Sequence, residues 1–498
     1  MRDSIRWRAM NRPTTAPEGR TPDDAAGLAL RARVGLVLGP ALAAGLLLLP
    51  APAGLDPAAW CTAAVGALMA TWWVTEAVPI PVTSLLPLVA FPLLGILPIG
   101  EAAAPYANPV IYLFLGGFVI ALAVQRRGLH ERMALTIVRW VGTRPPRLVL
   151  GFLLATAFVS MWVSNTATAA MMLPIAAAVV VMAERQEPPR RELATPLMLA
   201  VAYGANLGGI ATLIGTPPNA LLAGFLAETH GIEIGFARWM LFGVPLVAVA
   251  LPLCWLLLLR LHPLAGPELA GGRAYVAERL AALGRLSRAE RVVGGITAAV
   301  AVAWIARPWL ERLVPGLSDA GIAVAGGVAL FVAPVSLRPW RPALAWEDVA
   351  ELPWSVLLLF GGGLSLAEAI DGTGLAAWLG GSLGFAERWP LALVVLVVTA
   401  AIVFLTELTS NTATAAAFLP IAASLAVGAG ADPRALAVPC AVAASCAFMM
   451  PVATPPNAIV YGSGRVTVPA MVRAGLWVNL LMIALIEVAV LLLAPAVL

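Results

Sequence analysis

The residues best suited to chemistry in this chain are two copies of a Ser-Asn-Thr string, each inside a long apolar stretch. They are Ser164, Asn165 and Thr166 in the first copy, and Ser410, Asn411 and Thr412 in the second. Ser, Asn and Thr are preferred helix N-caps, so each string predicts the start of a helix within its apolar stretch. A helix start offers free N–H groups, hydroxyls and a partial positive dipole, which suit an anion.

The two strings belong to a longer internal duplication. Residues 164–176 and 410–422 are identical at eleven of thirteen positions, and Thr-Pro-Pro-Asn-Ala follows at 216–220 and 454–458. Proline removes a donor and clashes with the preceding turn, so each Pro-Pro pair predicts a broken helix. The carbonyl oxygens freed by such a break could hold a small monovalent cation beside the Asn amide oxygen.

The composition excludes an ordinary soluble protein. Of the 498 residues, 61% are apolar and 12% are charged, and the mean hydropathy is +0.91. Soluble domains carry about 25% charged residues. We therefore predict an all-α polytopic membrane protein whose partner is the lipid bilayer.

The basic residues, cysteines and histidines exclude several other function classes. All 31 basic residues are Arg and lie mostly between apolar runs, where they set topology rather than bind nucleic acid. The four Cys lie in apolar segments and the three His in polar loops, without a metal-ligand spacing. The spans contain no His-Glu-x-x-His, no Gly-x-Ser-x-Gly and no acidic dyad, so an enzyme is not expected.

The apolar runs predict about eleven transmembrane helices, with the N-terminus in the cytoplasm and the C-terminus outside. The expected spans are about 34–51, 58–76, 79–98, 109–125, 195–228, 239–259, 293–307, 319–337, 352–370, 435–462 and 472–497.

Two further stretches, 148–182 and 389–429, contain the Ser-Asn-Thr strings. The distribution of Arg is consistent if each enters and leaves the bilayer on one side as a re-entrant hairpin; two full spans for each stretch would also preserve the sidedness. Five crossings then separate the hairpins, so the second half is inverted relative to the first. Inverted repeats with interrupted helices at the midplane are typical of secondary transporters, whereas a channel would need a continuous pore.

At this level of detail the chain resembles the divalent anion/sodium symporter family. The resemblance rests on both Ser-Asn-Thr tips, on residues 72–79 (WWVTEAVP) and on residues 445–457 (SCAFMMPVATPPN), and it extends from about residue 34 to the C-terminus. It implies a homodimer that works by an elevator motion. A transport domain with both hairpins would slide against a fixed scaffold.

The resemblance also implies site residues. Substrate carboxylates would contact both Ser-Asn-Thr strings, with Pro455 nearby. The residues implied for two sodium sites are Ser160, Ser164, Asn165 and Gly215 in the first, and Thr406, Thr409, Asn411 and Ala453 in the second. Thr216 and Thr454 would neighbour these sites. Ser160 and Thr406 each lie four residues before their Ser-Asn-Thr, so the duplication supports the pairing independently.

Four acidic residues lie in or at the ends of apolar segments and are candidates for function: Glu76, Glu368, Asp371 and Glu407. Glu407 lies next to Thr406, and it either shapes the cation site or fills a structural hydrogen-bonded role. Glu76 is expected to anchor the end of a scaffold helix.

The expected function is sodium-coupled uptake of C4-dicarboxylates such as succinate, malate or fumarate across a bacterial inner membrane. Sodium is the co-transported ion, and no organic cofactor is expected. A sodium-independent dicarboxylate exchanger, or citrate or sulfate as cargo, remains an alternative.

The chain is expected to divide into four kinds of segment. They are a cytoplasmic tail at 1–33, scaffold helices at 34–147 and 293–388, a transport domain at 148–260 and 389–498, and a cytoplasmic linker at 261–292.

Overall fold

The computed structural model describes residues 22–382 and 389–498, whose regular secondary structure is helical apart from one two-stranded hairpin. The helices of the first half are α2 (Pro22–Leu48), α3 (Pro57–Thr75), α4 (Ile80–Thr83), α5 (Leu86–Leu93), α6 (Ile99–Ala103), η1 (Ala104–Ala107), α7 (Pro109–Arg126), α8 (Leu129–Val141), α9 (Pro145–Ser160), α10 (Asn165–Glu184), η2 (Arg191–Leu193), α11 (Ala194–Ile210), α12 (Pro217–His230), α13 (Phe236–Leu261) and α14 (Gly272–Ala282).

The second half repeats part of this order. Its elements are α15 (Arg288–Leu310), α16 (Asp319–Val332), β1 (Pro334–Leu337), β2 (Trp340–Pro342), η3 (Trp346–Glu351), α17 (Trp354–Gly372), α18 (Leu375–Ser382), α19 (Leu391–Thr406), α20 (Asn411–Gly428), α21 (Arg434–Ala443), α22 (Pro455–Gly462), α23 (Val468–Val488), η5 (Ala489–Leu493) and α24 (Ala494–Val497).

The predicted fold class, an all-α polytopic membrane protein, is confirmed. Ten helical segments among the described residues are long and apolar enough to cross a membrane. The set differs from the predicted spans in two ways. It includes α10 and α20, the second arms of the two predicted hairpins, with 20 and 18 residues. It omits three predicted spans, 79–98, 319–337 and 435–462, where the helices are shorter.

Proline and local polarity explain the shorter helices. The predicted span 79–98 is divided into α4 and α5, each of which has a proline at its start. Helix α16 ends at Val332, because Pro334 lacks the donor needed to continue it, and the chain turns into the β1–β2 hairpin. The predicted linker 261–292 contains α14, and the Arg-rich stretch before the first hairpin contains α8.

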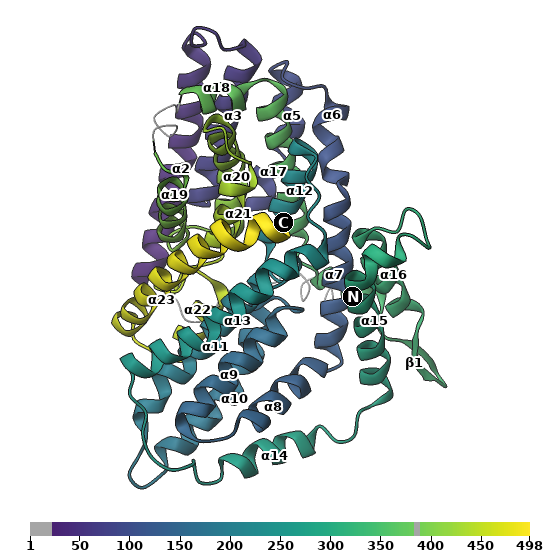
Figure 1. The fold of residues 1–498 in the computed structure, drawn as a ribbon, viewed down its shortest axis with the longest axis vertical. Coiled ribbons are helices and arrows are strands. Elements are labelled where there is room, and N and C mark those ends of the chain that lie inside the picture. The colour runs from purple at the N-terminus through teal and green to yellow at the C-terminus, as the bar shows by residue number, and fades with distance from the viewer. Residues whose placement is uncertain (1–21, 383–388) are drawn as a thin grey trace, which may run out of the picture.

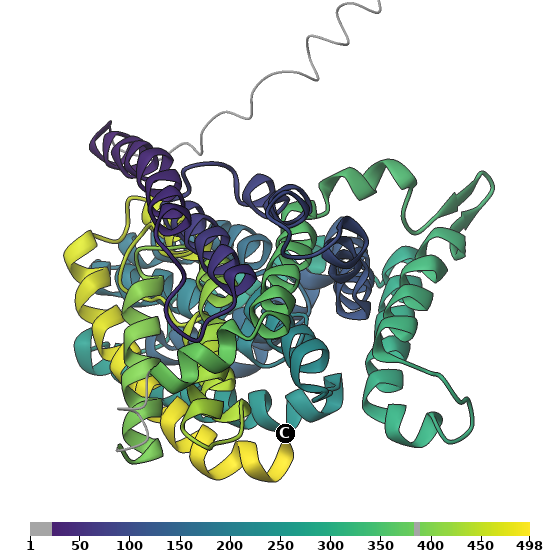
Figure 2. The same ribbon diagram turned by 90° about the horizontal axis from the view of Figure 1, so that it is seen from above.

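The elements form three regions across the molecule. Figures 1 and 2 place α15, α16 and the β hairpin along one side and α2 with α3 on the opposite side. Helices α9–α13 and α19–α23 form the third region, called the middle region below, of which α19 and α23 reach the edge of the molecule on the α2 side. Helix α16 packs closely on α7, where a Cβ added at Gly116 would lie 2.4 Å from the Ala323 carbonyl carbon, so this helix crossing requires glycine.

The middle region shows the internal duplication in its packing. Helix α9 packs on α11 as α19 packs on α21, while α10 packs on α22 and α20 packs on α12. The second arm of each hairpin therefore contacts the broken helix of the other half. Of the candidate spans, the segment containing α11 is the most buried, with 94% of an 18-residue stretch inside the protein.

Candidate functional site: the two hairpin tips and the broken helices

Each Ser-Asn-Thr string lies at a sharp turn between two helices, as the N-cap preferences predict. Helix α9 ends at Ser160 and α10 begins at Asn165, and α19 ends at Thr406 and α20 begins at Asn411. The Ser164 hydroxyl accepts a hydrogen bond from the Ala167 N–H at 3.4 Å, which caps α10.

The first tip brings four oxygen atoms together. Asn165 Oδ1 lies 2.7 Å from Ser160 Oγ, which also lies 2.8 Å from the Ala205 carbonyl oxygen. The same corner of the Asn165 amide is 3.2 Å from the carbonyl oxygens of Ala205 and Gly215. Only one hydrogen, that of the Ser160 hydroxyl, is available among these four oxygen atoms. Their mutual repulsion is relieved either when the Asn165 amide turns so that its nitrogen donates, or when a cation lies among the oxygens.

The second tip repeats this arrangement with different side chains. Thr406 Oγ1 lies 2.8 Å from Asn411 Oδ1 and 3.0 Å from the Ala444 carbonyl oxygen. Ala205 lies in α11, and Ala444 directly follows the end of α21. The structure thus brings together the predicted pairs Ser160 with Asn165 and Thr406 with Asn411, and it adds one backbone carbonyl to each.

Two predicted sodium ligands have other contacts. The Thr409 hydroxyl is 3.0 Å from the Leu405 carbonyl oxygen and 2.6 Å from the Thr414 hydroxyl. Ala453 is buried and donates its N–H to the Met450 carbonyl at 3.2 Å. Neither residue has a hydrogen bond to Asn411 among the described residues.

The predicted substrate-binding residues are accessible. Ser164, Thr166 and Pro455 are exposed, and the three residues at 410–412 are half-buried. Within the described chain, the hydroxyls of Thr166, Ser410 and Thr412 make no hydrogen bond, so they are free to donate to a carboxylate. The N-termini of α10 and α20 add N–H groups and a partial positive charge at the same places.

The Pro-Pro strings break two helices, as predicted. Helices α11 and α12 are separated by residues 211–216, and α21 and α22 by residues 444–454. The Thr454 hydroxyl accepts the Asn457 N–H at 3.3 Å and caps α22. Thr216 takes the corresponding N-cap place before α12 but forms no side-chain cap.

The asparagines of the Pro-Pro strings satisfy freed carbonyls through their amide nitrogens. Asn219 donates to the carbonyl of Thr212 at 2.8 Å, and Asn457 donates to those of Ala447 and Met450 at 3.1 and 3.0 Å. Sequence reasoning instead expected these carbonyls to face a cation. Gly215 is not among the carbonyls taken by Asn219.

The two broken helices meet through two contacts, each of which pairs a predicted neighbour of the sites, Thr454 or Thr216, with a residue that sequence reasoning did not assign to the site. Asn206 Nδ2 donates to the Thr454 hydroxyl at 3.1 Å, and the Thr216 hydroxyl lies 3.4 Å from that of Ser445. Asn206 and Ser445 directly follow Ala205 and Ala444, whose carbonyl oxygens face the two tips.

Glu407 holds the longer unwound segment in place. Its carboxylate accepts the N–H groups of Phe448, Met449 and Met450 at 2.7, 2.9 and 2.9 Å, and the Asn479 amide at 2.7 Å. Of the two roles left open by the sequence, the structural hydrogen-bonded role matches these contacts. The first hairpin has Met161 at the corresponding position and needs no such clamp, because α11 remains helical to Ile210.

Comparison with models of known protein families identifies the family of this chain. Residues 31–496 match the model of the sodium:sulfate symporter transmembrane region. The chain belongs to this symporter family. The predicted resemblance is therefore confirmed over nearly the whole chain.

Curated relatives of this symporter chain include bacterial carriers. The chain is 42% identical over 478 residues to the sodium-dependent dicarboxylate transporter SdcS of Staphylococcus saprophyticus, covering 93% of this chain and 92% of that one. It has the same identity and coverage with SdcS of Staphylococcus aureus.

Solved structures with the same overall fold are more distant in sequence. The YdaH transporter of Alcanivorax borkumensis matches with a TM-score of 0.53 at 15% identity, over 93% of this chain and 96% of that one. MtrF of Neisseria gonorrhoeae, described as one of a class of antimetabolite efflux pumps, matches with a TM-score of 0.55 at 15% identity, over 94% and 95%. At this identity the likeness concerns the fold alone.

Proposed function

We propose that this symporter couples sodium entry to the uptake of a C4-dicarboxylate such as succinate, malate or fumarate. The names of the SdcS relatives support the ion and the substrate class. The observation that carries the proposal is the repeated oxygen cluster: Ser160 with Asn165 and Thr406 with Asn411, each joined to a backbone carbonyl. Uncharged oxygen ligands of this kind suit a small hard cation.

The chemistry of the tips supports an anion as co-substrate. Neither Ser-Asn-Thr string contains a basic residue, so the charge of a dicarboxylate would be balanced by the starts of α10 and α20 and by bound sodium. Three or more sodium ions must accompany each dianion if the membrane potential is to assist uptake, because two sodium ions only neutralise its charge. Each net positive charge that enters gains about 2.3 kcal/mol per 100 mV.

In this proposal Asn165 and Asn411 each serve both ligands. The amide oxygen of each faces a sodium ion together with its Ser160 or Thr406 partner, and the Ser and Thr hydroxyls on either side face the substrate. Gly215 contributes its carbonyl to the first sodium site, while Thr409 and Ala453 complete the second. Pro455 borders the substrate.

The movement is proposed to be an elevator motion in a homodimer of the bacterial inner membrane. The middle region, which holds both hairpins and both broken helices, would slide against the outer helices. The N-terminus would lie in the cytoplasm and the C-terminus outside.

Uptake of radiolabelled succinate into proteoliposomes tests the proposal. Vesicles without internal dicarboxylate should accumulate succinate only when an inward sodium gradient is imposed. Uptake that ignores sodium but requires internal succinate would instead identify an exchanger. Competition by unlabelled citrate or sulfate that matches competition by succinate would change the assigned cargo.

A further inference from the structure

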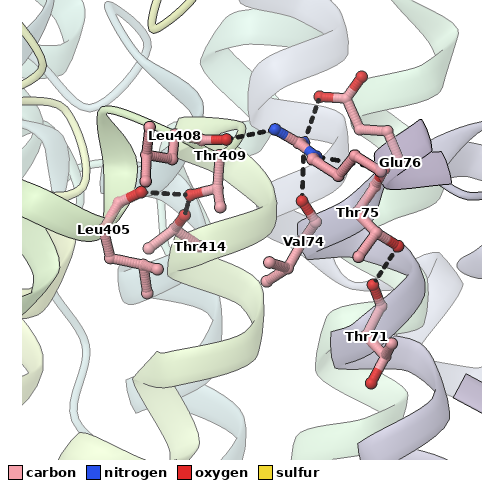
Figure 3. A network of polar contacts seen from close by, with 9 residues as sticks. Thr71, Val74, Thr75, Glu76, Leu405, Leu408, Thr409 and Thr414 are labelled. Atoms are coloured by element: carbon pink, nitrogen blue, oxygen red, sulfur yellow. Dashed lines mark hydrogen bonds and ion pairs between the residues drawn. The ribbon is translucent and has the colours of Figure 1, made fainter. Parts of the chain in front are cut away.

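Arg31, in the first half of α2, is held by the ends of two other helices. It donates from Nη2 to the Val74 carbonyl at 2.7 Å and from Nε to the Thr75 carbonyl at 3.4 Å. It also donates from Nη1 to the carbonyl of Leu408, in the tip of the second hairpin. Figure 3 shows the Val74 and Leu408 carbonyl groups directed at the same guanidinium group.

The position of these carbonyls explains why an arginine fits. Helix α3 ends at Thr75 and α19 ends at Thr406, so Val74, Thr75 and Leu408 carry carbonyls left unpaired at or just beyond helix C-termini. A helix C-terminus carries a partial negative charge, and the planar guanidinium places several donors in fixed directions. One side chain therefore ties together three segments that are distant in sequence.

Glu76 completes the arrangement on the α3 side. It is the C-cap of α3, with φ of 50°, and its carboxylate lies 3.8 Å from Arg31 Nη2. Both side chains are partly exposed, 30% for Arg31 and 49% for Glu76, so the ion pair adds less than the carbonyl contacts. The expectation that Glu76 anchors a helix end agrees with this place.

The two hairpin tips are held by different kinds of contact. Trp162 corresponds to Leu408 under the offset of 246 that relates the duplicated strings. Its ring lies 6.3 Å from that of Phe236, which stacks on Trp304 of α15 at 4.2 Å. The first tip thus rests on an aromatic stack, and the second is held by a charged donor that lies outside the duplicated strings.

We propose that Arg31 is a latch that holds the second hairpin tip against the end of α3 in this conformation and releases it when the tip moves. The release during transport rests on the proposed elevator motion, in which the tip slides past α2 and α3. The latched tip carries Thr409 and Ser410, which directly follow Leu408. Arg31 itself touches neither of these residues, so it is a positioning residue for them.

Thiol labelling of the tip tests the latch without requiring transport. Leu408 is 59% exposed and tolerates a reporter through Leu408→Cys, while Cys254, Cys440 and Cys446 are buried and Cys61 can be removed by Cys61→Ser. Labelling of the purified protein by a maleimide should be about tenfold faster after Arg31→Gln, the change expected for a lost charged hydrogen bond. Arg33→Gln is the matched control, because Arg33 is exposed and pairs with no other described residue.

Two further measurements separate the latch from a general structural role. Arg31→Lys keeps the charge, but its single ammonium group lacks the fork that joins both helices, so labelling should be intermediate. In uptake assays Arg31→Gln should change the maximal rate while the KM for sodium stays within about twofold. Equal labelling of the Arg31→Gln and Arg33→Gln proteins, or a large rise in the sodium KM, would overturn the latch. Absence of sodium-dependent uptake by the unmodified protein would instead refute the proposed function.

Discussion

The Asn206 amide nitrogen lies 3.1 Å from the Thr454 hydroxyl, and this contact joins the broken helix of one half to that of the other. Both residues are buried. A second contact, at 3.4 Å, joins Thr216, directly before α12, to Ser445, just after the end of α21. Each contact involves the residue next to a carbonyl of an oxygen cluster, since Asn206 follows Ala205 and Ser445 follows Ala444.

Removing either tip asparagine should abolish coupled transport. In Asn165→Ala and Asn411→Ala the cluster loses the side-chain oxygen that faces Ser160 or Thr406. Loss of a group that orients or binds a metal typically costs about 10–100-fold in affinity. Sodium-dependent stabilisation in detergent and succinate uptake should both fall, while size-exclusion profiles remain monodisperse. Full activity in either variant would show that the tip serves only as a helix cap.

Thr412→Val should weaken substrate binding more than sodium binding. The Thr412 hydroxyl is half-buried and has no partner in the described chain, so it is available to a carboxylate. Losing one hydrogen bond to a charged group should raise the KM for succinate about tenfold. Thr399→Val in α19 is the matched control, since its buried hydroxyl is also unpartnered but lies in the arm rather than the tip. An unchanged succinate KM would contradict the carboxylate contact.

Glu407→Gln should lower thermal stability whether or not sodium is present. The amide would turn an N–H donor toward one or more of the backbone N–H groups that the carboxylate now accepts, at a cost of about 2–3 kcal/mol. Glu101→Gln is a suitable control, because Glu101 is exposed and its carboxylate makes no hydrogen bond in the described part of the chain. A melting temperature that falls only when sodium is present would instead make Glu407 part of the cation site.

Gly209→Ala should impair sodium binding without altering any polar group. A Cβ at this position would lie 2.7 Å from Asn165 Oδ1 and 3.1 Å from the Gly215 carbonyl oxygen, so the cluster has to open. Gly295→Ala in α15 places the same methyl group where nothing lies within 4 Å. The sodium concentration for half-maximal uptake should rise in the first variant and remain unchanged in the second; equal values would show that the Asn165 amide can move without loss.

Local residue preferences were sufficient to predict much of the fold. The starts of α10 and α20 at Asn165 and Asn411 follow from N-cap preference, and the breaks before Pro217 and Pro455 follow from the missing proline donor. The duplication predicted that these four features belong to one site. The structure brings them together within the middle region, since each hairpin packs on the broken helix of the other half.

The contacts that local reasoning missed join residues far apart in sequence. Glu407 accepts hydrogen bonds from four N–H groups, whose positions depend on where α21 ends. The hydrogen bond from Arg31 to Leu408 spans 377 positions. The Asn457 amide was expected beside a cation, but its nitrogen turns toward carbonyls that only the folded segment brings near. Hydropathy also could not show that α16 ends at Val332 and that the apolar residues from Pro334 onward form a strand.

The most direct test of sodium-coupled dicarboxylate uptake is the initial rate of succinate entry into proteoliposomes as a function of external sodium. The internal solution contains no dicarboxylate, and potassium replaces sodium at constant ionic strength. The account predicts negligible entry without sodium and a steep, cooperative rise with sodium concentration, further increased by an inside-negative potential. Equal succinate entry at all sodium concentrations would contradict it.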